Sequence, residues 1–130
     1  METFPNMTTY RPTFHITPSK GWINDPNGFV FFKGEYHIFT QHNPFDTKWG
    51  PMHWLHFKSK DLIHWEECGV ALKPSESYDL VYGCFSGSVV VHDDKMFVYY
   101  TGADERRQVQ CLAVSEDGEH FTKYKDNNSR

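Results

Sequence analysis

Apolar positions along the chain fall into short runs separated by glycine, asparagine and aspartate, a pattern that predicts strands joined by turns. The run Phe29–Phe32 is apolar at every position, so we expect a strand with both faces covered. With Lys33-Gly34 and Glu35–Gln41 it predicts a hairpin. Further strands are predicted at residues 52–58, 86–92, 95–101, 108–115 and 121–124, and residues 63–68 are predicted to be a fourth strand or its start. A loose lead-in is predicted at 1–14 and a polar connection at 74–82.

The strand pattern repeats. Ser59–Trp65 and Ser115–Phe121 both read Ser-x-Asp-x-x-His-aromatic, at an offset of 56 residues. Gly28 and Gly87 each open a predicted hairpin and lie 59 residues apart. A four-stranded unit that recurs at this period indicates the blades of a β-propeller.

The length of the chain limits how much of a propeller it can form. A propeller closes with about four to eight blades, and 130 residues supply roughly two. We therefore expect residues 1–130 to be the N-terminal, incomplete part of a single β-propeller domain, either truncated or in need of a partner. The alternative is a compact two-sheet sandwich that is complete in itself.

Composition supports an all-β chain and narrows the possible partners. The 22 aromatic residues far outnumber the three alanines and five leucines, so strand formers dominate. A net charge of −4, with scattered basic residues, gives no reason to expect nucleic acid or an anionic membrane as a partner. The N-terminus has neither a basic start nor an apolar run, so we expect a cytoplasmic protein. The three cysteines are expected to be reduced thiols, although one disulfide is possible.

Residues Gly21–Gly28 form the densest group of turn-forming residues. Asp25-Pro26-Asn27-Gly28 fits a type I turn at each position, so Asp25 could simply cap its own turn. Pro26 nevertheless biases Asp25 toward an extended backbone, and Asn24 and Trp22 place an amide and an apolar wall beside it. A carboxylate held rigidly at the mouth of a β-scaffold is what glycoside hydrolysis needs on one side of the sugar.

The chain resembles glycoside hydrolase family 32, the invertases and sucrose-6-phosphate hydrolases, from about residue 11 to residue 125. Its motifs match in order: Arg11-Pro12-x-Phe14-His15, Trp22–Gly28, Gln41–Pro44, Trp49-Gly50-x-Met52-His53-Trp54, Asp61–Glu66, Gly83–Ser88, Tyr100-Thr101-Gly102 and Gln110–Ala113. The resemblance implies a five-bladed propeller with the active site at one end of its central tunnel. It also implies a retaining β-fructofuranosidase that acts on sucrose, sucrose 6-phosphate or a fructan.

The resemblance gives roles to single residues. Asp25 is expected to be the nucleophile, forming a covalent fructosyl intermediate. The fructose subsite is expected to be lined by three hydrogen-bonding side chains and two apolar ones: Asn24, Gln41, Ser86, Trp49 and Phe85. The same residues also have purely structural interpretations, as turn, strand-end and core positions.

The chain departs from the family pattern in several places. Thr40 stands where an aromatic residue commonly precedes the glutamine, and Leu55 where a glycine commonly follows the tryptophan. The Arg-Asp-Pro motif that carries the aspartate stabilising the transition state is missing. Glu67-Cys68 imitates the Glu-Cys motif of the acid/base, but it belongs to an earlier strand, so we do not assign Glu67 this role. We expect the acid/base to lie beyond residue 130.

The eight histidines do not predict a metal site. His53 and His56 are three apart on a predicted strand and therefore point to opposite faces. We expect no metal and no cofactor, and a small sugar as the ligand. The alternative function is a non-catalytic carbohydrate-binding or degenerate propeller fragment.

Overall fold

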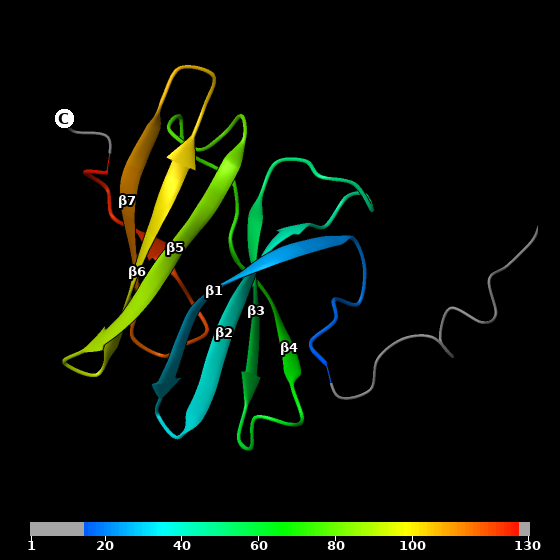
Figure 1. The fold of residues 1–130 in the computed structure, drawn as a ribbon. Helices are drawn as coiled ribbons and strands as arrows, with labels where there is room; N and C mark the ends of the chain where they lie inside the picture. The colour runs from blue at the N-terminus through cyan, green and yellow to red at the C-terminus, as the bar shows by residue number, and fades with distance from the viewer. Residues whose placement is uncertain (1–14, 128–130) are drawn as a thin grey trace, which may run out of the picture.

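The computed structural model describes residues 15–127, and the predicted lead-in at 1–14 lies outside them. The described chain forms two four-stranded antiparallel sheets in which each strand pairs with its neighbour in sequence (Figure 1). The first sheet holds β1 (Trp22–Phe32), β2 (Glu35–Asn43), β3 (His53–Ser59) and β4 (Glu66–Leu72), and the second β5 (Gly83–His92), β6 (Lys95–Ala103), β7 (Gln108–Ser115) and β8 (Thr122–Lys123). Within residues 15–127 there is no helix, and so none that could cross a membrane.

The two predicted hairpins are present. β1 and β2 are joined at Lys33-Gly34, with φ of 49° and 86°, and β5 and β6 at Asp93-Asp94, with φ of 51° and 60°. Two successive positive φ values are typical of the two-residue turn whose twist matches the twist of the flanking strands. Glycine reaches this region without strain and aspartate tolerates it, which explains Gly34, Asp93 and Asp94 at the turns.

The repeated Ser-x-Asp-x-x-His motif forms the same turn twice. Ser59 Oγ donates to Asp61 Oδ1 at 3.0 Å, and His64 Nδ1 lies 2.7 Å from Asp61 Oδ2. In the second sheet, Ser115 Oγ donates to Asp117 at 3.2 Å and His120 Nδ1 lies 2.7 Å from the same carboxylate. The sequence repeat is therefore a structural repeat, one turn per sheet.

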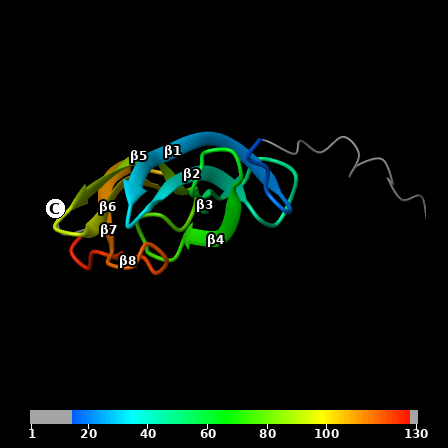
Figure 2. The same ribbon diagram turned by 90° about the horizontal axis from the view of Figure 1, so that it is seen from below.

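The two sheets lie side by side, with their first strands, β1 and β5, in contact. Figure 2 shows β1 and β5 along one side of the molecule and β4 and β8 along the opposite side. Met52 and Gly83 form a parallel bridge, with Cys84 N donating to Met52 O at 2.8 Å. The two sheets also contact each other through Phe39 of β2 and Phe121, the residue before β8, whose ring centroids are 5.6 Å apart. This same-order stacking, with a shared core between the sheets, is the arrangement of successive propeller blades.

Two local predictions are wrong, and one predicted strand begins later than expected. The fourth strand runs over Glu66–Leu72 instead of 63–68, because Asp61 Oδ1 accepts the N–H groups of Ile63 and His64 and keeps them out of a ladder. Residues 25–28 belong to β1 and are not a type I turn. Phe29 and Phe31 are 54% and 56% exposed, so within the described residues one face of β1 is open.

Candidate active site

One pocket of about 310 Å³ opens where the two sheets meet, near the start of β1. All six residues predicted to act on the sugar line it, together with three residues that the sequence did not single out for the site. The lining is Asn24, Asp25, Gln41, Trp49, Met52, Phe85, Ser86, Thr101 and Gln108. Residues distant in the sequence thus converge on a single hollow that is wide enough for a sugar ring.

A β-bulge presents the carboxylate of Asp25. Ile23 pairs with His42 and Pro26 with Thr40, so Asn24 and Asp25 together face the single residue Gln41 of β2. An extra residue in one strand of an antiparallel pair bends that strand and redirects its side chains. Pro26 is compatible with this irregular position because the outer strand of a sheet tolerates a missing N–H donor.

Hydrogen bonds orient the two amides beside Asp25. Trp22 Nε1 donates to Asn24 Oδ1 at 2.7 Å, so the amide NH₂ of Asn24 is left to donate. Asn27 Nδ2 donates to Gln41 Oε1 at 3.1 Å, which likewise leaves the Gln41 NH₂ for the pocket. Both amides therefore present donors, the groups that sugar hydroxyl oxygens accept from.

Asn27 also connects the two sheets at this point. It is only 6% exposed, and its Oδ1 accepts the N–H of Gly87 on β5 at a long 3.4 Å. Its single amide thus contacts a pocket residue of the first sheet and the strand of the second sheet that carries Phe85 and Ser86. In the sequence, Asn27 is predicted only as a turn residue, and no local signal marks this bridging position.

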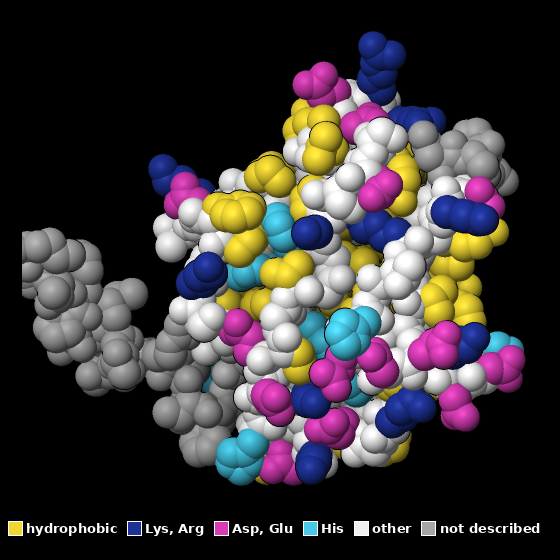
Figure 3. All heavy atoms as spheres, turned by 180° about the vertical axis from the view of Figure 1, so that it is seen from behind, with side chains coloured by type: hydrophobic (Ala, Val, Ile, Leu, Met, Phe, Trp, Pro, Cys, Tyr) yellow, Lys and Arg dark blue, Asp and Glu magenta, His cyan; other side chains and the backbone are white. Residues whose placement is uncertain are grey.

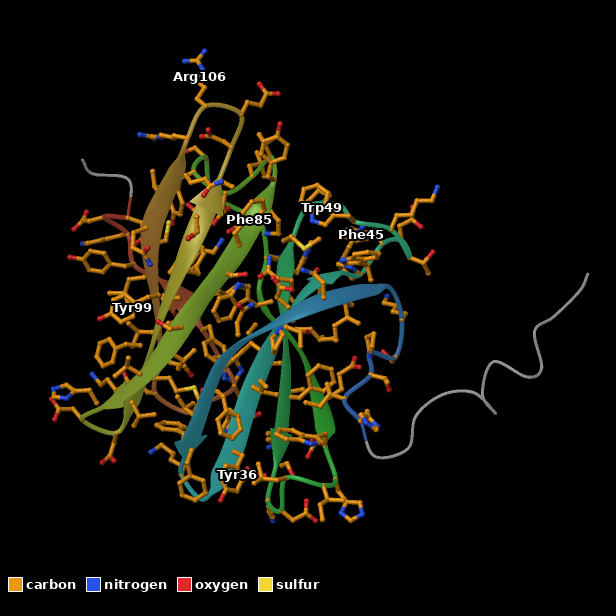
Figure 4. All side chains as sticks on the ribbon, in the orientation of Figure 1. Tyr36, Phe45, Trp49, Phe85, Tyr99 and Arg106 are labelled. Carbon is orange, nitrogen blue, oxygen red and sulfur yellow. The ribbon has the colours of Figure 1, made fainter. Side chains whose placement is uncertain are left out.

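The apolar wall of the pocket comes from both sheets. Trp49, on the loop between β2 and β3, and Phe85, on β5, contact each other edge to face with ring centroids 6.3 Å apart (Figure 4). Trp54 lies below them, and its Nε1 donates to Phe85 O at 3.0 Å. Trp49 is 52% exposed, so it forms the rim of the pocket and not its base.

Met52, Thr101 and Gln108 line the pocket although the sequence analysis did not assign them to the site. Thr101 is paired with Phe85 across the β5–β6 ladder. Counting back from the Asp93-Asp94 turn places Thr101 opposite the Phe85–Ser86 region, so hairpin register was a signal that could have found it. No comparable local signal marks Gln108, which opens the next strand.

The histidine that anchors the start of β1 is neutral near pH 7. Burial lowers the pKa of His42, although its hydrogen bond to the Trp22 carbonyl opposes this effect. The 2.9 Å contact joins His42 Nδ1 to Trp22 O, and a carbonyl only accepts, so Nδ1 carries the proton. Among the described residues, no three histidine, cysteine, aspartate or glutamate side chains come together as metal ligands would.

Glu67, which we did not assign as the acid/base, lies away from Asp25. Its two carboxylate oxygens accept hydrogen bonds from Ser19 N at 2.8 Å and Ser19 Oγ at 2.9 Å. It lines a different hollow, together with His15 and Trp65. Glu67 therefore fixes the segment before β1 against β4 and is not part of the Asp25 pocket.

The two departures from the family pattern are neighbours in space. Thr40 of β2 pairs directly with Leu55 of β3, and both are buried. Residues directly opposite in an antiparallel pair project to the same face. A smaller side chain at 40 is therefore matched by a larger one at 55, and neither residue lines the pocket.

The face in Figure 3 shows acidic and basic side chains intermixed over its surface. No continuous basic stripe crosses this face, in keeping with the net charge of −4. The arrangement is unlike the clustered lysines and arginines of a nucleic-acid interface.

Residues 15–129 match the model of the glycosyl hydrolases family 32 N-terminal domain. A sucrose-6-phosphate hydrolase of Zymomonas mobilis is 53% identical over 120 residues, covering 86% of this chain and 23% of that protein. A raffinose invertase of Escherichia coli is 48% identical over 124 residues, covering 88% of the chain and 26% of the invertase. The chain spans about a quarter of the length of these relatives.

Solved structures of family members also resemble this chain. A GH32 β-fructofuranosidase of Bombyx mori matches with a TM-score of 0.82 and 46% identity, over 92% of this chain and 26% of that one. A sucrose-6-phosphate hydrolase of Lactobacillus gasseri matches with a TM-score of 0.83 and 39% identity, over 91% and 25%. These relatives are β-propeller enzymes, so the predicted propeller is confirmed over the sandwich alternative. The family resemblance is confirmed as well: the chain belongs to glycosyl hydrolase family 32.

Proposed function

We propose that the protein containing this chain is a retaining β-fructofuranosidase that hydrolyses sucrose or sucrose 6-phosphate. The observation that carries the proposal is the convergence of Asp25 with the amides of Asn24 and Gln41 and the aromatic wall of Trp49 and Phe85 in one pocket. Relatives named as a sucrose-6-phosphate hydrolase and a raffinose invertase share about half of the residues of the aligned chain. A β-fructofuranosidase from Bombyx mori, with an aspartate replaced, has also been solved with sucrose.

Asp25 is the proposed nucleophile. Its carboxylate oxygen forms a bond to the anomeric carbon of fructose as the glycosidic bond breaks, and the leaving oxygen takes a proton from an acid. Water then attacks the fructosyl ester, and the carboxylate is released. The amide donors of Asn24 and Gln41 hold fructose hydroxyls, and Ser86 and Thr101 add hydroxyl groups from the second sheet.

The mechanism needs a second carboxyl about 5–5.5 Å from the first. Asp25 is the only acidic residue among those of the described chain that line this pocket. The acid/base must then come from residues outside the described part of the chain. We accordingly propose no turnover for the 130 residues in isolation.

The same observation supports a second candidate function, a carbohydrate-binding module without catalysis. Donor amides and aromatic rings would bind a sugar whether or not an acid/base completes the site. This reading predicts sugar binding without bond cleavage.

The test is a sucrose-hydrolysis assay on the protein expressed from the complete coding sequence, with Asp25→Asn as the variant. The substitution keeps the size of the side chain and removes the attacking oxygen's charge. We expect turnover to fall at least about 10³-fold, while sucrose still binds by calorimetry. Near-normal turnover in Asp25→Asn would reject the nucleophile assignment, and binding without any turnover in the unaltered protein would favour the binding module.

A further inference from the structure

The loop at the rim of the pocket carries an aromatic side chain that the proposed fructose site does not use. Phe45 is 81% exposed, the largest fraction among the large apolar residues of the described chain. It lies on the same β2–β3 loop as Trp49, and Figure 4 shows both rings at the end of the molecule where Phe85 lies. A phenyl ring left in water beside a sugar pocket forgoes burial worth about 1.5–3 kcal/mol, which a ligand could recover.

The loop holds Phe45 in a fixed position. Asn43 is only 4% exposed, its Oδ1 accepts the Phe45 N–H at 3.1 Å, and its Nδ2 donates to Lys48 O at 2.9 Å. One buried amide therefore fixes the backbone at Phe45 and at the residue before Trp49. The Asp46 carboxylate accepts the N–H of Thr47 at 2.6 Å and closes the tip of the loop.

The ring of Phe45 is supported on one side only. It contacts the ring of His53 at 5.6 Å with an interplanar angle of 76°. His53 is buried, and burial lowers its pKa, so this support is neutral near pH 7. Phe45 is thus a positioned apolar surface backed by an uncharged ring, the chemistry that packs against the apolar face of a neutral sugar.

Aromatic rings continue from the pocket onto the loop between β2 and β3. Phe85 and Trp49 contact each other and both line the pocket. Phe45, four residues before Trp49 on the loop, does not line it, so its ring lies outside the hollow that holds Asp25.

We propose that a sugar chain whose terminal fructose lies at Asp25 leaves the pocket over Trp49, and that Phe45 forms an outer subsite for the third sugar of neutral oligosaccharides that end in fructose. This inference rests on the proposed fructosidase function and names the substrate class that the site favours. The subsite adds affinity for trisaccharides and longer chains that a disaccharide cannot gain.

The test compares sucrose with the trisaccharides raffinose and 1-kestose, using the protein expressed from the complete coding sequence. The quantity measured is the ratio of kcat/KM for each trisaccharide to kcat/KM for sucrose. We expect Phe45→Ala to lower this ratio about fivefold to tenfold, the loss of one aromatic contact of about 1 kcal/mol or slightly more. Phe45→Trp should retain the ratio, because it keeps an aromatic face.

Thr47→Ala is the matched control, since Thr47 is an exposed non-aromatic residue two positions along the same loop. We expect it to retain the unaltered ratio. An unchanged ratio in Phe45→Ala overturns the outer subsite, even where sucrose is hydrolysed normally, and assigns Phe45 to another role such as a protein contact. A protein that hydrolyses neither sucrose nor the trisaccharides overturns the fructosidase proposal itself, which is a different result.

Discussion

Replacing Asn27 by alanine tests whether the contact between the two sheets controls the pocket. The substitution removes the donor to Gln41 Oε1, 3.1 Å away, and the acceptor for Gly87 N, 3.4 Å away. Gln41 is 4% exposed, so its Oε1 loses a partner in a place that water reaches poorly. Each unpaired buried group costs about 1–3 kcal/mol. The Gly87 bond is long and contributes at the low end, so we expect a total loss of about 2–4 kcal/mol.

Asn27→Asp separates stability from function. Aspartate keeps an acceptor for Gly87 N–H but repels Gln41 Oε1, so the Gln41 amide should rotate and present its oxygen to the pocket. We expect Asn27→Asp to lose less stability in urea unfolding than Asn27→Ala, yet to raise KM for sucrose about tenfold, the effect of one misplaced donor. Thr122→Ala, an exposed position on β8, is the control for general effects. Unchanged KM and unfolding midpoints in both Asn27 variants would refute the bridging role.

Three further predictions concern stability in the same unfolding assay. Thr40 Oγ1 is a buried hydroxyl with no hydrogen-bond partner within the described residues. Thr40→Val should therefore stabilise the fold by about 1 kcal/mol, and a lower free energy of unfolding in this variant would contradict the unpaired state of the hydroxyl. Gly28 has φ of 59° and its added Cβ would meet Val89, so Gly28→Ala should cost about 1–3 kcal/mol, less when combined with Val89→Ala. Burial lowers the pKa of His56 from its usual 6.5 to about 3, so the stability contributed by the neutral imidazole is fully present above about pH 6.5 and is lost as pH falls toward 3. We expect this acid slope to flatten in His56→Gln, and an unchanged slope would refute it.

The repeating pattern made the strands predictable, and motif resemblance made the site residues predictable. The two hairpin turns follow from glycine and aspartate at Lys33-Gly34 and Asp93-Asp94, where local residue preference alone selects the conformation. The six site residues came from ordered motifs, and the structure brings all six to one pocket. Their chemical roles stay predictions until the assays above are done.

The error at residues 25–28 arose where a tertiary contact overrides a local preference. Asp25-Pro26-Asn27-Gly28 has the composition of a turn, yet the ladder with β2 extends through it as a bulged strand. Asn27 supplies the reason, because its amide is bonded to Gln41 and Gly87 instead of to its own turn. Strand pairing and contacts with a residue 60 positions away could not be read from a four-residue window.

The first strands of the two sheets share one irregularity and differ in another. Each has a shift of register near its glycine, between Asn27 and Val30 in β1 and between Phe85 and Ser88 in β5. β1 alone has a second shift, at Asn24-Asp25. The shared shift belongs to the repeat and fits the close approach of β1 and β5, as the position of Val89 against Gly28 indicates. The second shift cannot serve the repeat, because β5 forms its sheet without it. A bulge that one blade has and the next lacks is the position where a specialised carboxylate is expected, since bulges commonly redirect side chains next to active sites.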